Sequence, residues 1–537
     1  MRSEYFDVLV VGGGITGAGV AWDAAARGLR VALIEQGDYA GGTSSRSSKL
    51  IHGGLRYLAQ GHLALTREAV AERGRLQRLA PHLVDLLPFA FPVFGGPAER
   101  LKLTAGLWLY DAFAAGSGAP RHSWLGRGAT LAVAPGLRPD GLSGAFIYRD
   151  ARTDDARMVV EVLRAATGAG AAVANHVAMQ GLLTAKGRAV GVAAEDRLGH
   201  QAFEIRARVV VLAAGVWLNR LVPPSPSGDG TKVRPAKGVH LFLMPGRVPL
   251  DTAFYLSTTS DKRLIFVVPW LGRTMVGTTD TAYSGDLVTP TASVADVRYL
   301  LDAVNAAFPA AAFAPSDVLS SQAGLRPLIS DGAGSNGNTA AISREDRVFE
   351  TETGAIAIAG GKLTTFRRMA EKVVDRAAKR LSGPRGVGPS PTAHFPLGGF
   401  PTPLDAGAFS SWRAAALATA APAQRARRAR LIERYGAHYT SLEDLIATEP
   451  ALGDTLLPGE PFLKAEVSYA IRHEQAVTVA DVLAQRLRLA LLTHDHGLGV
   501  AVMVADLLAR EYGWDAGRRD QALAEYATDV AQYAVPT

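Results

Sequence analysis

The glycine pattern Gly12-x-Gly14-x-x-Gly17 constrains the fold of this chain more than any other feature of its sequence. An apolar run over residues 6–11 comes directly before it and predicts a buried parallel strand, and residues 18–26 after it have the apolar spacing of a helix. In this context the first glycine allows a tight turn, the second lets the backbone approach a pyrophosphate, and the third packs the helix against the strand. The pattern therefore predicts a strand–turn–helix unit that binds phosphate at its helix N-terminus.

The next segment completes a βαβ unit. Residues 31–34 form a second apolar run, and Glu35 follows at its end. At this position an acidic side chain accepts a hydrogen bond from the ribose of a bound ADP group. Strand, glycines, helix and acid in this order predict a Rossmann-like dinucleotide-binding domain, and a purely structural turn between strand and helix is the alternative.

The absence of cysteine limits the chemistry open to the chain. It excludes disulfides, thiolate metal sites, iron–sulfur clusters and a redox-active cysteine pair, so electron transfer requires a bound organic cofactor, and we expect no metal. A chain of 537 residues is also too long for one hydrophobic core. We therefore expect about two to four domains.

A formal net charge of +7 suits a nucleic acid, an anionic membrane surface or an anionic substrate as partner. The densest basic run, residues 425–430, is interpreted as the solvated face of a helix, and no nucleic-acid-binding module is visible, so we expect no nucleic acid. The apolar stretches 86–96 and 103–115 are too short to span a bilayer. We favour core burial for both, with a place in a membrane interface as the alternative.

A polar loop follows the ribose-binding acid over residues 43–57. Its hydroxyl groups can bind pyrophosphate oxygens and its paired glycines let the backbone approach a flat ring, whereas a polar surface loop is the alternative. Arg56 near its end has two interpretations, a surface charge or an anion ligand beside the ring. The loop residues expected to bind a cofactor are Thr43, Ser44, Ser48, Lys49, His52, Gly53 and Gly54.

Three further clusters carry side chains that can bind anions or move protons. His240 follows two basic residues, although a lone histidine is more often structural than catalytic. The run 277–280, Gly-Thr-Thr-Asp, taken alone is an ordinary turn at a strand end. Arg326 and Arg344 have the chemistry of a bidentate clamp for phosphate or carboxylate, whereas each alone is more simply an ion-paired arginine.

Two later glycine turns also follow apolar strands. Gly215 comes shortly after the apolar run 209–212, and Gly-Gly-Lys-Leu-Thr-Thr (360–365) follows a strand and begins a helix. The positive N-terminal end of that helix would stabilise the anion that develops at the edge of a reduced flavin. Lys362 can add a phosphate contact, and its spacing excludes a Walker A loop.

These motifs, in this order, closely resemble the FAD-dependent glycerol-3-phosphate dehydrogenases of the aerobic, membrane-associated, quinone-linked type. The resemblance rests on DVLVVGGGITGAGVAWDAAARGLRVALIEQGDYAGGTSSRSSKLIHGGLRYL at the N-terminus and on GTTD, GLRPL, ISRED and GGKLTTFR, and it extends over about residues 5–380. The stretch AVTVADVLAQRLRL (476–489) is similar to the family's helical cap, although Gln485-Arg486-Leu487-Arg488 stands where an Arg-Arg-Thr-Arg-like run is usual.

The resemblance implies a flavoprotein that oxidises sn-glycerol 3-phosphate to dihydroxyacetone phosphate by hydride transfer from C2 to N5 of FAD and then reduces a membrane quinone. It places His240 and Arg326 at the reacting hydroxyl, with the base left open between His240 and a water. The substrate-binding residues that it implies are Arg56, Tyr57, Arg344 and Lys362. Outside the polar loop, the residues expected to bind FAD are Gly12, Gly14, Gly17, Glu35, Gly215, Gly361, Leu363, Thr364 and Thr365.

The expected fold is α/β, with a discontinuous Rossmann-like FAD-binding domain, a β-rich substrate domain and a C-terminal all-helical cap domain. The apolar spacing in 480–492 and 499–509 predicts helices in the last of these. The expected boundaries are 1–85, 140–232 and 345–381 for the FAD-binding domain, 86–139 and 233–344 for the substrate domain, 382–404 for a linker and 405–537 for the cap.

We expect a cytoplasmic protein, because the first strand leaves no room for a signal peptide. Its basic charge favours peripheral association with the anionic inner face of the cell membrane, and a homodimer is left open. Three alternatives remain: a glycerol-3-phosphate oxidase that uses O2 and makes H2O2, a flavin oxidoreductase acting on an amino acid or a 2-hydroxy acid, and a catalytically inactive flavin-binding regulatory or scaffold protein.

Overall fold

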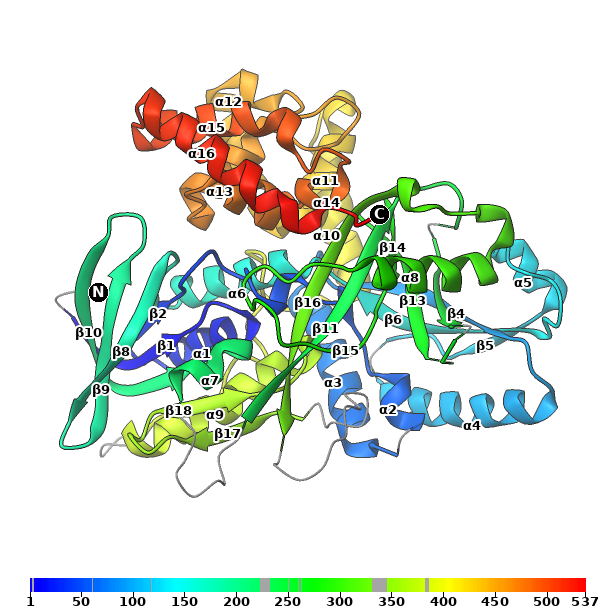
Figure 1. Ribbon diagram of the computed structural model, residues 1–537, viewed down its shortest axis with the longest axis horizontal. Helices are drawn as coiled ribbons and strands as arrows, with labels where there is room; N and C mark the ends of the chain where they lie inside the picture. Colours follow the sequence, from blue (N-terminus) through cyan, green and yellow to red (C-terminus); the bar gives the residue numbers. More distant parts are fainter. Residues whose placement is uncertain are drawn as a thin grey trace.

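The computed structural model describes residues 1, 4–59, 61–116, 118–222, 232–249, 251–258, 260–261, 263–330, 345–381 and 386–537. Figure 1 shows two β-sheets side by side, with the helices from the C-terminal end of the chain (orange and red) above them. The α/β fold with a helical C-terminal domain that the sequence predicts is confirmed.

The first sheet is built around β1 (Tyr5–Val11), which pairs in parallel with β2 (Val31–Ile34) and β10 (Gln201–Leu212). All four residues of β2 and the last four of β1 are buried, as expected for strands covered on both faces. The complete order is β17 (Arg347–Glu350), β18 (Ile356–Ala359), β10, β1, β2 and β7 (Ala172–Ala174), with β9 (Arg188–Asp196) pairing with β10 and β8 (Val177–Ala185) pairing with β9.

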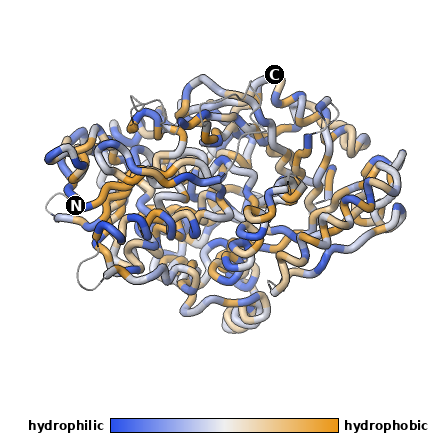
Figure 2. Tube along the Cα trace, turned by 90° about the horizontal axis from the view of Figure 1, so that it is seen from below, coloured by the Kyte–Doolittle hydropathy of each residue, from blue (hydrophilic) through white to orange (hydrophobic). Residues whose placement is uncertain are grey.

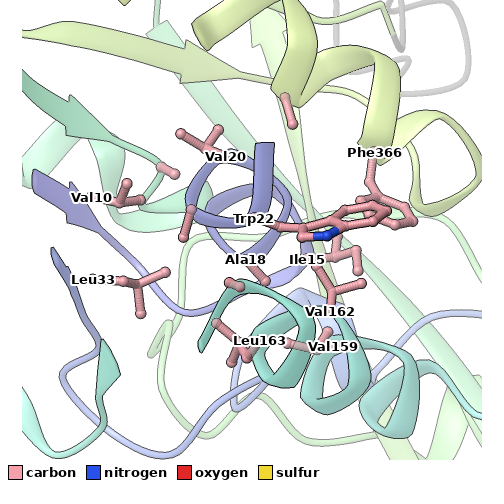
Figure 3. Close-up of a cluster of buried hydrophobic side chains, with 14 of the residues drawn as sticks. Val10, Ile15, Ala18, Val20, Trp22, Leu33, Val159, Val162, Leu163 and Phe366 are labelled. Atoms are coloured by element: carbon pink, nitrogen blue, oxygen red, sulfur yellow. The ribbon is translucent and has the colours of Figure 1, made fainter. Parts of the chain in front are cut away.

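Three helices pack against this sheet: α1 (Ile15–Ala26), α6 (Asp155–Gly168) and α9 (Phe366–Leu381), and α1 packs against both of the others. Figure 3 shows Trp22 of α1 between Phe366 of α9 and Val159 of α6, and all three side chains are buried. Figure 2 shows strongly hydrophobic segments beside the N-terminus, where the first sheet lies. This core fixes the start of α1 relative to the ends of the strands.

The second sheet is largely antiparallel and lies beside the first (Figure 1). Its strand order is β15 (Thr281–Ala282), β11 (Lys232–Leu243), β14 (Arg273–Gly277), β13 (Leu264–Trp270), β12 (Ala253–Ser257), β4 (Asp85–Val93), β6 (Gly144–Arg152) and β3 (Leu50–Ile51), with β16 (Val318–Ser330) on β11 and β5 (Ser123–Gly126) on β6. The remaining helices before the C-terminal region are α2 (Leu55–Ala59), α3 (Leu63–Leu79), α4 (Pro97–Ala114), α5 (Arg127–Val133), α7 (Leu218–Leu221) and α8 (Val294–Ala307).

The structure places the two apolar stretches that the sequence singled out. The apolar stretch 86–96 is largely strand β4, which is core as favoured, whereas 103–115 falls mostly in α4, of which only one face is buried. β6 lies within a range assigned to the FAD-binding domain, yet it pairs with β4 in the second sheet. The expected domain boundaries therefore stay a prediction. Among the described helices, none is both long and apolar enough to cross a membrane.

The C-terminal helices, which we call the cap (residues 405–537), do not include the single helix expected over 480–492. A π-helical turn, Asp481–Arg486, is followed by Arg488 with a φ of +66°, and a new helix then begins. The N–H of Leu487 donates to the carbonyl of Val482, five residues back, which is the π-helical pattern. The helices of the cap are α10 (Ala406–Ala418), α11 (Arg425–Tyr435), α12 (Tyr439–Thr448), α13 (Lys464–Glu474), α14 (Leu489–Leu492), α15 (Leu498–Tyr512) and α16 (Ala516–Asp529).

Buried ion pairs join the cap to the first sheet's helices. The guanidinium of Arg157, on α6, pairs with Glu474 of the cap and, at 2.8 Å, with Glu161 one helical turn away. All three side chains are at most 1% exposed. Removing one partner of a buried pair leaves an uncompensated charge, which is far more destabilising than losing an exposed pair.

We expect Arg157→Met to lower the free energy of unfolding by about 3–5 kcal/mol, because Glu161 and Glu474 would stay buried without the cation that pairs with both of them. Arg206→Met is the control, since Arg206 and Glu204 form an exposed pair, and its effect should stay below about 1 kcal/mol. Equilibrium denaturation of both variants measures the difference. Equal effects would show that the pair does not hold the cap.

Candidate active site

The turn between β1 and α1 leaves no room for side chains at its glycines. Gly12 has a φ of +115°, and a Cβ there would lie 2.5 Å from the carbonyl oxygen of Ala213. A Cβ on Gly17 would overlap the carbonyl oxygen of Gly12. Side chains at these positions would therefore push the helix away from the strand ends, as the glycine pattern predicts.

A cavity of about 350 Å³ opens at this turn. It is lined by the ends of parallel strands and by the loops that follow them. The predicted cofactor residues on its wall are Gly12, Gly14, Glu35, Thr43, Ser44, Gly215, Gly361 and Leu363, and the predicted substrate residue Lys362 lies there as well. A Cβ on Gly215 would meet no atom within 4 Å, so the backbone there is open to the cavity. A glycine cradle with one acid and two hydroxyls fits the ADP portion of a dinucleotide.

Polar side chains of this cavity are oriented by backbone N–H groups. The carboxylate of Glu35 accepts hydrogen bonds from Gly13 N at 2.6 Å and Gly37 N at 3.0 Å. Burial raises the pKa of this carboxyl, and the two hydrogen bonds oppose that rise. Ser44 Oγ accepts from the N–H of Ile15, the first residue of α1, at 2.9 Å. Both predicted groups thus lie at the turn that begins the helix.

Residues 52–57 and 362–364 meet although they are far apart in sequence. Thr364 Oγ1 accepts from the backbone N–H of His52 at 3.1 Å and donates to its carbonyl at 3.2 Å. The Lys362 ammonium lies over the Tyr57 ring, 3.4 Å from its centroid. Lys362 and Thr364 belong to the segment just before α9, and Tyr57 belongs to α2. The structure therefore brings together two predicted cofactor residues and two predicted substrate residues.

A buried group that sequence reasoning missed supports Gly53. Its N–H donates to Tyr110 Oη at 3.0 Å and to Asp150 Oδ1 at 3.3 Å. The same carboxylate oxygen accepts from Arg73 Nη1 at 2.6 Å. A Cβ on Gly53 would collide with Val70 and with Tyr110. Gly53 is thus fixed by a polar network contributed by α3, α4 and β6, and no local motif identifies those three partners.

His240 lies on β11 and is 2% exposed. Its Nε2 and Ser48 Oγ are 2.9 Å apart, which joins the second sheet to the polar loop. Burial, together with the charges of Lys49 and Arg326, lowers the pKa of His240 to about 3, so the ring is neutral at physiological pH. On the adjoining strands, Gly277 and Gln322 stand opposite His240.

Arg326 lies on β16, on the same face of the sheet as His240. Its guanidinium donates to Thr278 Oγ1 at 3.0 Å and to the carbonyl of Thr279 at 3.2 Å, and it pairs with Asp280 at 3.3 Å. A Cβ on Gly238 would overlap this guanidinium. The Gly-Thr-Thr-Asp run is therefore the support of Arg326, a function that the run alone did not predict.

The Lys49 ammonium lies in a buried polar environment, unlike the predicted cofactor residues on the wall of the cavity. Its ammonium is fully buried and hydrogen bonds to the Asp155 carboxylate at 3.0 Å, to the Ser45 carbonyl at 3.0 Å and to Gln322 Oε1 at 3.2 Å. Burial lowers the pKa of Lys49 to about 8. Its predicted role at the cofactor stays a prediction, and its observed contacts are with the protein.

Two predicted substrate residues cannot be placed by their side chains. Arg56 belongs to α2, but its side chain lies outside the described part of the structure, and Arg344 lies outside the described residues altogether. Glu345, which follows Arg344, is next to the Gly360 turn, because a Cβ on Gly360 would contact its carbonyl oxygen. Thr365 Oγ1 donates to the Lys362 carbonyl at 3.5 Å.

One group of side chains has ligand atoms close enough for a metal ion. Atoms of Asp38, His176 and Asp481 lie within 4.8 Å of one another. Asp38 also pairs with Arg486 at 2.9 Å, and His176 with Asp481 at 3.1 Å. These ion pairs already satisfy the three side chains, which form part of the contact between the cap and the first sheet.

Comparison with protein families matches residues 7–367 to the FAD dependent oxidoreductase family. Residues 390–519 match the C-terminal domain of alpha-glycerophosphate oxidase. The boundary between the two matches falls in the segment that precedes the cap.

Relatives are similar over nearly the full chain. Glycerol-3-phosphate dehydrogenase 2 of Mycobacterium bovis is 39% identical over 99% of this chain and 89% of its own length. Aerobic glycerol-3-phosphate dehydrogenase of Bacillus subtilis is 36% identical over 96% of this chain and 93% of its own. Among solved structures, the glycerol-3-phosphate dehydrogenase of Bacillus halodurans complexed with FAD superposes with a TM-score of 0.81, at 32% identity, over 99% of this chain and 96% of that one.

We expect Gly17→Ala to weaken FAD binding by about tenfold to a hundredfold, because its Cβ would overlap the Gly12 carbonyl and overpacking of this kind costs about 1–3 kcal/mol. Gly106→Ala, in α4, is the control, since its Cβ would meet no atom within 4 Å. Titration of each apoprotein with FAD measures affinity. Unchanged affinity in the Gly17 variant would contradict the placement of the dinucleotide at this turn.

Proposed function

The chain belongs to the FAD-dependent glycerol-3-phosphate dehydrogenase family, and from this premise we propose that it oxidises sn-glycerol 3-phosphate to dihydroxyacetone phosphate and passes the electrons to a membrane quinone. The observation that carries the proposal is a dinucleotide cavity that has Lys362, stacked over the Tyr57 ring, on its wall. The polar loop that borders this cavity contacts His240 through Ser48. Bound FAD supplies the acceptor for the hydride that leaves C2 of the substrate.

Cations just before α9 and on α2 suit the phosphate of the substrate. Lys362 stands two residues before Thr364, at the N-terminal end of the helical segment, where the helix dipole also favours an anion. Arg56 is the neighbour of Tyr57, whose ring lies under the Lys362 ammonium. Arg344 directly precedes Glu345, which touches the Gly360 turn. We therefore assign these three cations to the phosphate, which they would hold in a fixed orientation.

The face of the second sheet suits the carbinol end of the substrate. His240 is neutral because burial lowers its pKa to about 3, so its ring can accept the hydroxyl proton as C2 loses its hydride. A substrate dianion bound nearby would raise this pKa, since an anion stabilises the imidazolium form. Arg326, held by Thr278 and Asp280, would stabilise the developing alkoxide, and it stays protonated throughout.

One amphipathic helix supports the membrane part of the proposal. α4 buries Leu107 and Tyr110, each 1% exposed, while Leu101 and Trp108 on its other side are 72% and 54% exposed. The guanidinium of Arg121 lies 5.7 Å from the Trp108 ring centroid. Exposed apolar side chains beside basic ones favour insertion into the interface of an anionic leaflet. We propose α4 as the segment of contact.

Variants at the carbinol end and at the phosphate end of the proposed site should affect different steady-state constants. We expect His240→Ala to lower kcat by about a hundredfold or more, as loss of a general base does, with a smaller effect on KM. We expect Lys362→Met to raise KM for glycerol 3-phosphate by about tenfold to a hundredfold with FAD retained, because a charge-assisted contact is lost.

Two controls accompany this measurement. His82→Gln replaces another buried histidine, and Lys379→Met replaces an exposed lysine of α9; both variants should keep normal kinetics. A purely KM effect of His240→Ala would reject its role as proton acceptor. An unchanged KM in Lys362→Met would remove Lys362 from the phosphate site.

A membrane assay tests the acceptor and the contact helix together. With anionic vesicles that contain a quinone, we expect the double variant Leu101→Ser/Trp108→Ser to lose vesicle binding and quinone-dependent turnover, while turnover with a soluble dye stays normal. Leu498→Ser is the matched control, since Leu498 is an exposed apolar residue of α15. Release of one H2O2 per substrate in the absence of quinone, at the quinone-dependent rate, would instead identify an oxidase.

A further inference from the structure

A buried cation from the cap reaches the loop that borders the cofactor cavity. Arg488 Nη2 donates to the Ser45 carbonyl at 2.8 Å and lies 3.3 Å from Asp155 Oδ1. Lys49 Nζ binds the same two groups, each at 3.0 Å. Arg488, Lys49 and Asp155 are all fully buried. Two cations from distant parts of the chain therefore share one carbonyl and one carboxylate oxygen.

The second oxygen of Asp155 holds the same loop from the other side. Asp155 Oδ2 accepts from Ser47 N at 3.1 Å and from Ser47 Oγ at 2.7 Å. Despite burial, which raises it, the charges of Lys49 and Arg488 keep the pKa of Asp155 below its usual range, so the carboxylate stays ionised and able to accept all of these bonds.

The loop segment held in this way lies between its two functional contacts. Ser44, just before it, binds the N–H of Ile15 at the dinucleotide turn, and Ser48, just after it, binds His240. A shift of the Ser45 carbonyl would therefore move both the hydroxyl at the start of α1 and the hydroxyl that orients the His240 ring. Displacements of about 1 Å at such positions are enough to reduce a rate strongly.

The backbone of the cap is shaped to deliver this side chain. Arg488 has a φ of +66°, a conformation that residues other than glycine seldom adopt and that persists only where the surroundings hold it. It follows the π-helical turn Asp481–Arg486, whose last residue pairs with Asp38 at 2.9 Å. Near the C-terminus, Gln532 Oε1 accepts from Arg46 Nη2 at 2.8 Å. Arg486, Arg488 and Gln532 of the cap thus contact Asp38, Ser45 and Arg46.

We propose that Arg488 is a positioning residue: from the cap, and together with Lys49 and Asp155, it fixes the 45–48 segment and through Ser44 and Ser48 sets the FAD site and the orientation of His240. The part of this inference that concerns His240 rests on the proposed function, whereas the expected effect on FAD binding does not. The cap is on this view a part of the cofactor site rather than an independent domain.

The test uses the full-length protein with Arg488→Met, which keeps much of the side-chain length but removes the charge and all donors. Arg434→Met is the matched control, because Arg434 is a buried arginine whose partners, Glu466 at 3.3 Å and the Arg486 carbonyl at 2.9 Å, both belong to the cap. Thermal unfolding, FAD affinity, the visible circular dichroism of the bound flavin and steady-state kinetics are measured for both.

We expect both variants to melt at lower temperature, but only Arg488→Met to bind FAD about tenfold or more weakly, to change the flavin dichroism and to lose about tenfold in kcat with KM nearly unchanged. Normal FAD affinity, dichroism and kcat in Arg488→Met, with a melting shift like that of Arg434→Met, would make Arg488 a structural anchor only and overturn the proposal.

If Arg488→Met does not fold, Arg488→Lys decides the question. A lysine keeps the charge but cannot present the planar fork of donors, so we expect an intermediate loss of FAD affinity. A lysine variant with wild-type affinity and dichroism would overturn the proposal. FAD affinity and flavin dichroism are measured without substrate, so they stay informative if the proposed function fails. That failure would show separately, because glycerol 3-phosphate would then not reduce the flavin bound to the wild-type protein.

Discussion

Three parallel strands end side by side at one edge of the first sheet, and the rest of the site depends on that alignment. The register pairs Val11 of β1 with Leu212 of β10, and Leu212 with Ala357 of β18. Each strand is followed by a glycine turn, so Gly12, Gly215 and Gly360 come to one edge although they are distant in sequence. Ligands of open parallel sheets bind outside the carboxyl ends of the strands. The discontinuous nucleotide domain follows from this alignment.

One face of the second sheet has glycine at three positions that lie beside larger residues. Gly238 lies beside the Arg326 guanidinium, Gly277 beside the His240 ring and Gly324 beside Arg46, and a Cβ on any of the three glycines would overlap its neighbour. In a strand interior glycine weakens the sheet, and its presence at these three positions allows the close approach of the Arg326 and His240 side chains and of the Arg46 backbone. The first sheet thus supplies a turn for phosphates and the second a platform for one imidazole and one guanidinium.

The sequence predicts those parts of the molecule whose signals are local. β1, α1 and β2 follow from an apolar run, three glycines and one acid within 31 residues, and the structure places them nearly as expected. The sequence did not predict that β6 belongs to the second sheet, because an isolated strand pattern does not reveal its partner. Its pairing with β4 is set by the whole second sheet. Likewise, Tyr110, Asp150 and Arg73 meet at Gly53 from three elements. Such networks depend on long-range packing, which no local spacing encodes. The roles assigned to the site residues, and the domain boundaries, stay predictions.

The composition of the 43–49 loop explains why it is held by charges. A run of hydroxyl side chains suits phosphate oxygens, but it offers no apolar group that could anchor the loop in a core. Its backbone must therefore be fixed by polar partners, and buried polar groups are tolerated only where each is satisfied. Asp155, Lys49 and Arg488 meet this condition together, because each would be an uncompensated buried charge without the others. A buried loop backbone without apolar anchors thus depends on charged partners, and in this fold the cap provides one of them, Arg488.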